Sequence, residues 1–296
     1  MIAFKRDEFT SRTIALMKFK QLFQAGFDSL LEPLPLRLLV LRALDSIFSF
    51  LPYETKLQVR SITRSQYGFG LLQAGRLAAR LGIPRISAIE FGVAGGNGLL
   101  ALEDHARRTT RETGVEIDIY GFDSGAGLPQ PIDYRDMPYA WEEGFYAMDV
   151  ERLKSRLKSS KLVIGDVRDT IEGFAAANPA PVGFISFDLD YYSSTMSALR
   201  MLDLKFDNLL PRVFCYFDDV AGGPRVCYNQ FTGELLAIDE FNQAHSDRKL
   251  AQIAGLRHNY RTLPVLWHEQ IYVAHLFQHP HYNTRTIAED QRLKLQ

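Results

Sequence analysis

The sequence predicts an α/β fold, built on a doubly wound, mostly parallel sheet that follows an N-terminal helical extension. Apolar runs of strand length alternate with helical patterns from residue 86 onward, which indicates right-handed crossovers with helices on both faces of a sheet. The run 181–190, "PVGFISFDLD", has almost no polar break, as expected for a strand buried on both faces. The notable polar motifs follow the ends of predicted strands, where such sheets bind their ligands.

The first part of the chain, residues 1–84, is predicted to be the helical extension. The stretch 65–82 has apolar residues at helical spacing and ends at Gly82, two residues before Pro84. The apolar stretch 29–52 is interrupted by charged residues and prolines, so it lacks the uninterrupted length that a membrane span needs. We expect an amphipathic helix there, packed on the protein or on a second subunit in a homo-oligomer, in preference to one bound at a membrane surface.

The second domain is predicted to be residues 85–296, with an insertion at about 221–256. Its predicted strands are 85–92, 115–123, 161–167, 181–190 and 211–219, with two late strands at 258–264 and 269–277. Its predicted helices are 99–114, 151–160, 168–179, 195–206 and, within the insertion, 233–245.

Composition and charge exclude few classes of function, but they set expectations for the partners and the compartment of the protein. The chain has 296 residues, a formal net charge of -1 and a pI of about 6.7, so we expect no nucleic-acid partner. The N-terminal residues mix both charge signs and lack the apolar core of a secretory signal. The two cysteines, Cys215 and Cys227, match no zinc-ligand pattern and suit a reducing compartment, so we expect a cytoplasmic protein.

The glycine-rich stretch "EFGVAGGNG" (90–98) follows the first predicted strand of the sheet and opens a helix. Glycines there let the backbone approach a ligand closely, and a helix N-terminus favours negative charge. From Gly92 the spacing is G-x-x-G-G-x-G, which matches neither the dinucleotide fingerprint G-x-G-x-x-G nor a P-loop. A nicotinamide-dependent oxidoreductase is therefore disfavoured. The loop suits a ligand that brings an amino-acid carboxylate and a ribose, and the alternative is a tight turn without a ligand.

Single acids follow the second and third strands. Asp123, in "YGFDSGAGLP", stands where an open sheet presents a carboxylate to the two hydroxyls of a ribose. Asp166, in "IGDVRD", could accept a hydrogen bond from the exocyclic amine of an adenine. For each residue the alternative is a capping aspartate.

Four carboxylates follow the fourth and fifth strands. Asp188 and Asp190 are two residues apart, so on an extended chain they point to the same face, and Asp218 and Asp219 end the next strand. Carboxylates packed together repel, and an all-oxygen ligand set suits Mg²⁺, Mn²⁺ or Ca²⁺. The alternative is that these acids cap helices or pair with arginines, namely Arg168, Arg212 and Arg225.

Four segments together, "EFGVAGGNG", "GFDSGAGLP", "DLDYYSST" and "FDD", resemble the class I S-adenosylmethionine-dependent methyltransferases, and within them the macrocin O-methyltransferase family. The match covers roughly residues 86–242, and its specific part is the Asp-x-Asp…Ser-Thr segment with the later Asp-Asp pair. The chain departs from the family pattern at Leu189, where glycine is usual, at Ser193, where an acid is common, and in the longer stretch after strand five.

The resemblance implies a seven-stranded Rossmann-like sheet and O-methylation of a hydroxyl on a sugar or similar natural product, a small-molecule acceptor. The cofactor that the resemblance implies is S-adenosyl-L-methionine, bound by ten residues: Glu90, Gly92, Val93, Gly95, Gly96 and Asn97 at the methionine end, Asp123 and Ser124 at the ribose, and Asp166 and Val167 at the adenine. The implied ligands of Mg²⁺ or another divalent cation are Asp188, Asp218 and Asp219.

The predicted catalytic residues are Asp188, as ligand and base together, and Asp190, with His245 as a rival base. The aromatic segment, residues 129–146, is expected to cover a ring-shaped acceptor or, alternatively, to pack its own aromatics together; these are Tyr134, Tyr139, Trp141, Phe145 and Tyr146. Two other functions stay open, a metal-independent methyltransferase and a cofactor-binding protein without catalysis.

Overall fold

The computed structural model of the protein describes residues 36–258 and 264–287. The chain forms two compact units, residues 1–50 and 51–296. In the first unit the structure describes helix α2 (Leu36–Phe48), within the stretch expected to form an amphipathic helix. The expectations for residues 1–35 lie outside the described residues, and the homo-oligomer stays a prediction. None of the described helices combines the length and apolar character that crossing a membrane requires.

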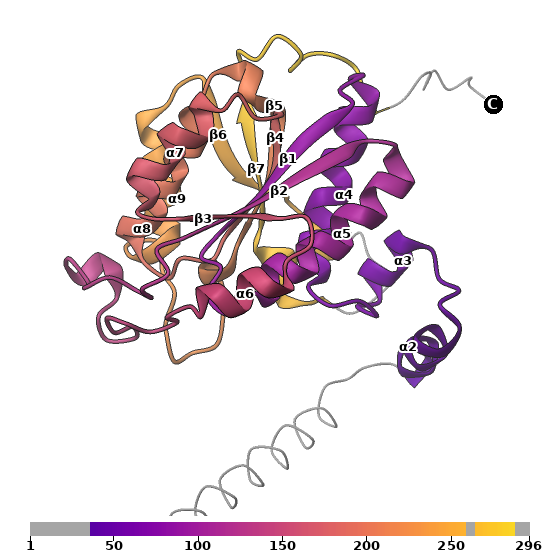
Figure 1. The fold of residues 1–296 in the computed structure, drawn as a ribbon, viewed down its shortest axis with the longest axis horizontal. Helices are drawn as coiled ribbons and strands as arrows, with labels where there is room; N and C mark the ends of the chain where they lie inside the picture. Colours follow the sequence, from indigo (N-terminus) through magenta and orange to yellow (C-terminus); the bar gives the residue numbers. More distant parts are fainter. Residues whose placement is uncertain (1–35, 259–263, 288–296) are drawn as a thin grey trace, which may run out of the picture. The chain divides into compact units, whose positions relative to one another are not determined.

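The second unit is built on one seven-stranded sheet in the order β3-β2-β1-β4-β5-β7-β6 (Figure 1). Strands β1 to β5 run parallel to one another, whereas β7 is antiparallel to both β5 and β6. This confirms the predicted doubly wound, mostly parallel sheet. The strands are β1 (Arg85–Phe91), β2 (Glu116–Asp123), β3 (Lys161–Ile164), β4 (Val182–Phe187), β5 (Leu209–Phe217), β6 (Arg248–Gln252) and β7 (Ile271–Leu276).

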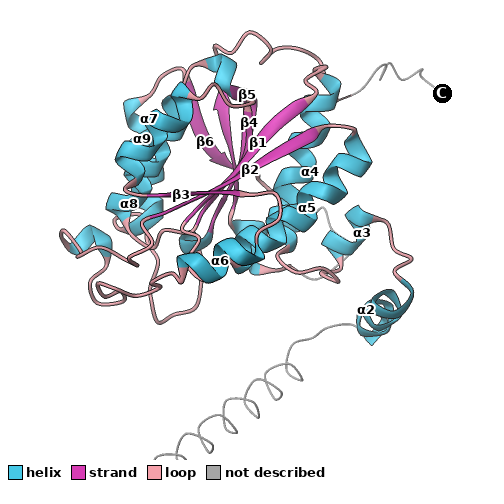
Figure 2. Ribbon diagram, in the orientation of Figure 1, coloured by secondary structure: helices cyan, strands magenta, loops and turns pink. Residues whose placement is uncertain are grey.

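Helices cover both faces of the sheet (Figure 2). Helices α4, α5 and α6 contribute to an apolar cluster on one face, and α7, α8 and α9 contribute to a second cluster on the other. The helices of this unit are α3 (Tyr53–Gln58), α4 (Ser65–Arg80), α5 (Asn97–Thr113), α6 (Val150–Arg156), α7 (Val167–Ala176), α8 (Tyr192–Leu199) and α9 (Gly233–Ala244). Short 3-10 helices are η1 (Tyr134–Asp136), η2 (Arg200–Asp203), η3 (Phe206–Asn208), η4 (Asp218–Val220), η5 (Leu256–His258) and η6 (Leu266–Glu269).

Burial explains why the central strands are so apolar. All residues of β4 are buried, because the strand lies between β1 and β5 and carries helices on both faces. Helix α4 packs on α5, β4 and β5, so the boundary expected at residues 84 and 85 falls inside this compact unit, which begins at Leu51.

The sixth strand differs from the prediction. It is Arg248–Gln252, inside the expected insertion, whereas residues 259–263 of the predicted strand 258–264 lie outside the described residues. The pattern was hard to recognise because β6 is an edge strand in which only Leu250 is buried. Helix α9 packs on β6 and on α8, so the segment 221–256 helps to complete the sheet and one of its covering layers.

Candidate active site

A cavity of about 720 Å³ lies at the carboxyl ends of the parallel strands, within the usual range for small-molecule sites. All ten residues that the resemblance assigns to the cofactor line this cavity, as do the four acids that follow β4 and β5. The segments that meet there are far apart in sequence, but parallel strands bring their carboxyl ends to one edge of the sheet.

The glycine loop, residues 92–98, joins β1 to α5, and its glycines leave the backbone uncovered by side chains. Gly92 has a φ of +81°, and a Cβ at this position would lie 1.8 Å from the carbonyl oxygen of Asp188. Only glycine therefore allows the loop to pass this close to the end of β4. Gly95 has nothing within 4 Å of where its Cβ would be, so this part of the loop faces open space.

Glu90 lies near the end of β1, two residues before this loop, and is almost fully buried, with 1% of its surface exposed. Its Oε1 accepts a hydrogen bond of 2.8 Å from the Tyr67 hydroxyl, while its buried Oε2 has no hydrogen-bond partner among the residues that the structure describes. Burial raises the pKa of Glu90 to about 7. An unpartnered buried carboxylate oxygen suits a cationic ligand group, such as an ammonium.

The carboxylate of Asp123 fastens the glycine loop to β2. Its Oδ2 accepts hydrogen bonds from the backbone N–H groups of Val93 at 2.8 Å and Ala94 at 2.9 Å, and its Oδ1 accepts one from Gly125 at 2.6 Å. Asp123 thus makes the turn-capping contacts that the sequence left as an alternative to ribose binding, and it also lines the cavity.

Asp166 is the N-cap of α7. It accepts a 2.8 Å hydrogen bond from the backbone N–H of Arg168 and pairs with the guanidinium of the same residue, which lowers its pKa. The capping alternative is therefore the contact present, although Asp166 and Val167 also line the cavity.

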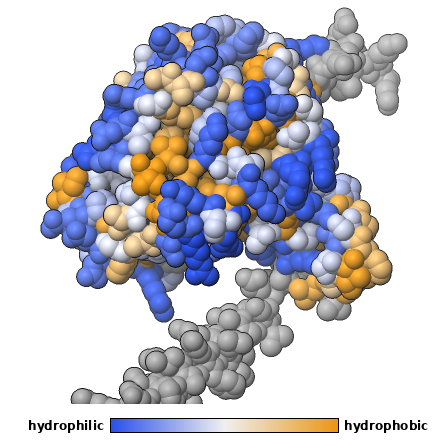
Figure 3. All heavy atoms as spheres, viewed as in Figure 1, coloured by the Kyte–Doolittle hydropathy of each residue, from blue (hydrophilic) through white to orange (hydrophobic). Residues whose placement is uncertain are grey.

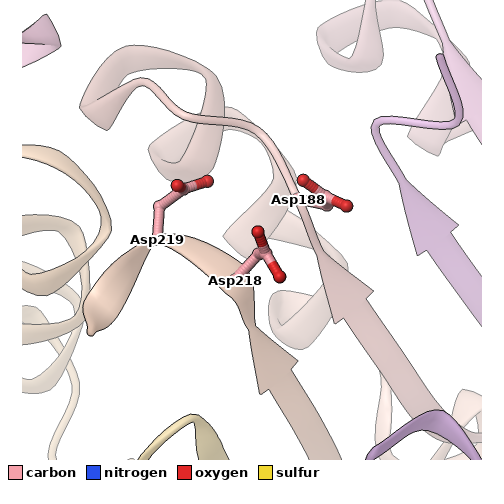
Figure 4. Close-up of side chains that lie close together, drawn as sticks. All are labelled: Asp188, Asp218 and Asp219. Carbon is pink, nitrogen blue, oxygen red and sulfur yellow. The ribbon is translucent and has the colours of Figure 1, made fainter. Parts of the chain in front are cut away.

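The acid cluster consists of Asp188, Asp218 and Asp219, the three residues expected to bind a metal. One carboxylate oxygen from each lies within 4.8 Å of those of the other two. Figure 4 shows Asp188 after one strand and Asp218 and Asp219 after its neighbour, which are β4 and β5. The set of three carboxylates fits the oxygen preference and charge of Mg²⁺.

Asp190 does not extend the strand, contrary to our expectation of two acids on one face of an extended chain. Strand β4 ends at Phe187, and Asp190 has a left-handed backbone with a φ of +59°. Its N–H donates to Oδ2 of Asp219 at 3.2 Å, so Asp190 supports the acid cluster through its backbone. The side chain still lines the cavity.

Desolvation and mutual repulsion act on these acids together. Burial and the neighbouring carboxylates raise the pKa of Asp188 well above its usual value, that of Asp190 to about 8 and that of Asp219 to about 6. Crowding of this kind is relieved by a counter-charge, by hydrogen-bond donors or by protonation.

Three donors that the sequence analysis did not single out already contact the acid cluster. The Tyr228 hydroxyl donates to Oδ1 of Asp219 at 2.7 Å, the Tyr216 hydroxyl donates to Asp218, and Nη1 of Arg64 lies 3.8 Å from Oδ2 of Asp188. Tyr216 could have been recognised, because it lies near the end of β5, two residues before Asp218. Arg64 and Tyr228 could not, because only the fold brings the N-terminus of α4 and the loop after β5 to this edge.

A fourth missed residue, Glu234, supports the backbone of the cluster. Its side chain is fully buried at the start of α9, and its Oε2 accepts a 2.9 Å hydrogen bond from the N–H of Asp219. Burial and the charge of Asp219 raise its pKa well above the usual value.

The aromatic segment contributes to the cavity with only part of its residues. Trp141 and Tyr146 line it, whereas Tyr134, Tyr139 and Phe145 do not. Asp136 anchors the segment by accepting hydrogen bonds from Ser193, 2.8 Å from its N–H and 3.0 Å from its hydroxyl. The molecular face in Figure 3 is largely hydrophilic with scattered apolar patches.

His245, the rival base, lies outside the cavity lining. Its Nε2 is 2.9 Å from Oδ1 of Asp203, and its Nδ1 is 2.9 Å from the carbonyl oxygen of Phe241. These contacts give His245 a structural role at the C-terminal end of α9.

Comparison with known proteins gave matches among solved structures alone. No family model and no curated protein matched the chain. The calicheamicin methyltransferase CalS11 is 22% identical over 74% of this chain and 82% of its own, with a TM-score of 0.48. The O-methyltransferase NovP is 16% identical over 71% of this chain and 80% of its own, also with a TM-score of 0.48. The mycinamycin-pathway methyltransferase MycE, solved with Mg, SAH and mycinamycin VI, is 14% identical over 70% of this chain and 50% of its own, with a TM-score of 0.35.

Proposed function

We propose that the protein is an S-adenosylmethionine-dependent O-methyltransferase that acts on a hydroxyl of a small molecule, a sugar or similar natural product, with a divalent cation at the acid cluster. The observation that carries the proposal is the shared cavity. The ten residues that the resemblance assigns to the cofactor and the three assigned to the metal line one space, although they come from five different strand ends.

Different residues of the cavity lining would bind different parts of the cofactor and the acceptor. The glycine loop and Glu90 would hold the methionine end of the cofactor, with Asp123 and Ser124 at the ribose and Asp166 and Val167 at the adenine. Trp141 and Tyr146 offer flat apolar surface to a ring-shaped acceptor on the remaining side. Holding both reactants in line is a large part of catalysis in such a transfer.

In the reaction the acceptor oxygen attacks the cofactor's methyl carbon, the carbon–sulfur bond breaks, and the sulfonium becomes a neutral thioether. The hydroxyl proton must leave, and Asp188 is the carboxylate that we propose accepts it, because it belongs to the acid cluster and lies near the glycine loop. Asp188, Asp218 and Asp219 would hold a divalent cation, which when bound would act as a Lewis acid and lower the pKa of the acceptor hydroxyl.

A metal-independent methyltransferase is the second candidate, and a specific observation favours it. Each member of the acid cluster already has a donor or cation beside it, Arg64, Tyr216 or Tyr228. Such contacts also occur around metal ligands, where they orient the carboxylates. Binding measurements distinguish the two cases.

The test is calorimetric titration of the protein with S-adenosylmethionine, with and without Mg²⁺. We expect micromolar binding of the cofactor and a separate Mg²⁺ signal that Asp218→Asn abolishes. The matched control is Asp207→Asn, an exposed aspartate outside the cavity, which should leave both signals unchanged.

The outcomes separate the candidates. Cofactor binding with no Mg²⁺ signal would favour the metal-independent enzyme. Cofactor binding without turnover of any sugar or phenol in an acceptor screen would favour a binding protein, and no cofactor binding at all would refute the methyltransferase.

A further inference from the structure

The charge of the cavity is strongly one-sided. Among the described residues that line it, Arg64 is the one basic side chain. The acids that line it number eight: Glu90, Asp123, Glu143, Asp166, Asp188, Asp190, Asp218 and Asp219. Among the side chains that line the cavity, the Arg64 guanidinium is therefore the one cation that can meet a carboxylate of a ligand.

Arg64 is held firmly at the N-terminus of α4. Its backbone is left-handed, with φ 48° and ψ 52°, a conformation that costs free energy in a residue other than glycine. Its carbonyl oxygen accepts the N–H of Tyr67 at 3.0 Å, and its guanidinium carbon lies 5.0 Å from the centre of the Tyr67 ring. The packing therefore fixes the direction of this side chain.

The guanidinium joins the two acidic parts of the cavity. Its Nη1 donates to the Tyr67 hydroxyl at 3.1 Å, and that hydroxyl donates to Oε1 of Glu90 at 2.8 Å. The same Nη1 lies 3.8 Å from Oδ2 of Asp188. Among the described residues, no hydrogen-bond partner occupies Nη2 or Nε, and the side chain remains 31% exposed. A guanidinium has five donors in a planar fork, so its remaining donors can bind a carboxylate in two-point fashion.

We propose that Arg64 binds the α-carboxylate of the cofactor's methionine end, while the unpartnered Oε2 of Glu90 takes the adjacent ammonium. This inference rests on the proposed function. The methionine end carries one anionic and one cationic group on the same carbon, and Arg64 and Glu90 offer the opposite charges on either side of the Tyr67 hydroxyl that both contact. Because Arg64 also faces Asp188, it fixes the cofactor's methionine end relative to the acid cluster.

The test compares two ligands that differ only in this carboxylate. S-Adenosylhomocysteine carries it, and the decarboxylated analogue, 5′-(3-aminopropylthio)-5′-deoxyadenosine, keeps the amine and loses the carboxylate. Calorimetric affinities are measured for the wild type, Arg64→Met and Arg64→Lys. We expect Arg64→Met to weaken S-adenosylhomocysteine roughly 10- to 100-fold, since hydrogen bonds to charged groups are lost. The decarboxylated analogue should bind wild type and variant within about threefold of each other.

Arg64→Lys should give an intermediate loss, because lysine keeps the charge without the fork. The matched control is Arg76→Met, on the same helix, whose guanidinium pairs with Glu54 away from the cavity. Thermal melting of each variant verifies that it folds, and Arg64→Lys carries the test alone if Arg64→Met does not.

Each outcome decides the inference. An equal loss for the two ligands, or no loss for S-adenosylhomocysteine, overturns the role of Arg64 and leaves the proposed function intact. Failure of the wild type to bind either ligand overturns both, and that failure is visible before any variant is measured.

Discussion

The acids on the two halves of the sheet's carboxyl edge have opposite surroundings. After β2 and β3, Asp123 and Asp166 accept backbone N–H groups, and Asp166 pairs with an arginine that lowers its pKa. After β4 and β5, carboxylates face one another, and the pKa values of Asp188 and Asp219 are raised. In the first half the carboxylates hold loop and helix backbone in place, whereas in the second half they lie close to one another and their negative charge requires a counter-charge, a donor or a proton.

Glu90 is the exception on the cofactor side. It lies in β1 between the two halves, and only one of its oxygen atoms is hydrogen bonded. The comparison therefore depends less on position along the sheet than on whether backbone amides are available to the carboxylate. Where they are absent, a side-chain donor, a counter-charge or protonation must satisfy the buried carboxylate.

The largest effect on stability is expected at Gly92, where the loop after β1 passes close to the end of β4. Gly92→Ala would place a Cβ 1.8 Å from the carbonyl oxygen of Asp188, at a φ of +81°. We expect a loss of about 3 kcal/mol or more in the free energy of unfolding, because strain and overpacking add. Urea denaturation measures it. Gly95→Ala, with nothing within 4 Å of its Cβ, is the control and should cost under about 1 kcal/mol. Equal costs at the two positions would show that the halves are not in contact there.

The next effect concerns Glu90 and pH. Its pKa is about 7 in the folded protein against a usual 4.5, so the folded state binds this proton more tightly than the unfolded state. Its contribution to stability therefore falls as pH rises from about 4.5 to about 7. Glu90→Gln removes the ionisation and can still accept the Tyr67 hydroxyl. We expect a variant close to wild type in stability at pH 4.5 and more stable at pH 8, by at most about 3 kcal/mol.

Urea denaturation of both proteins across this pH range gives the difference, in which the other acids cancel to first order. A constant difference between pH 4.5 and pH 8 would mean that Glu90 is ionised throughout and already has a counter-charge. In that case Glu90 would belong with Asp123 and Asp166 in the comparison.

These contrasts show what could be predicted from the sequence. Strand ends were recognisable because apolar runs stop at acids, so the sequence predicted which acids meet at the carboxyl edge of the sheet. The backbone path was not recognisable. Asp190 leaves the strand at a left-handed residue, and Arg64, Tyr228 and Glu234 reach the cluster only through long-range packing. Spacing along one strand predicts which residues share a face, but it contains no information on donors from another element.

A smaller effect is expected from the donors on the acid cluster. Tyr228→Phe removes the hydroxyl that donates to Asp219, and loss of such a contact around a metal ligand typically costs about tenfold in metal affinity. Mg²⁺ titration in the presence of S-adenosylhomocysteine measures it. Tyr139→Phe is the control, because its hydroxyl donates to the carbonyl of Val226 and not to an acid. If both variants bind Mg²⁺ like the wild type, the tyrosine does not orient a metal ligand.

The smallest effect tests whether Asp166 is more than a cap. Serine caps helices about as well as aspartate, so Asp166→Ser should change the free energy of unfolding by less than about 0.5 kcal/mol. If the carboxylate also accepts a hydrogen bond from the adenine amine, cofactor affinity should fall by about three- to tenfold, the value of one hydrogen bond. Asp149→Ser is the control, since Asp149 caps α6 by accepting the N–H of Arg152 and lies outside the cavity. Calorimetry with S-adenosylhomocysteine measures the affinity of both variants. An unchanged affinity in both would show that the Asp166 carboxylate caps α7 and does not contact the adenine, so that its contacts are with the protein alone.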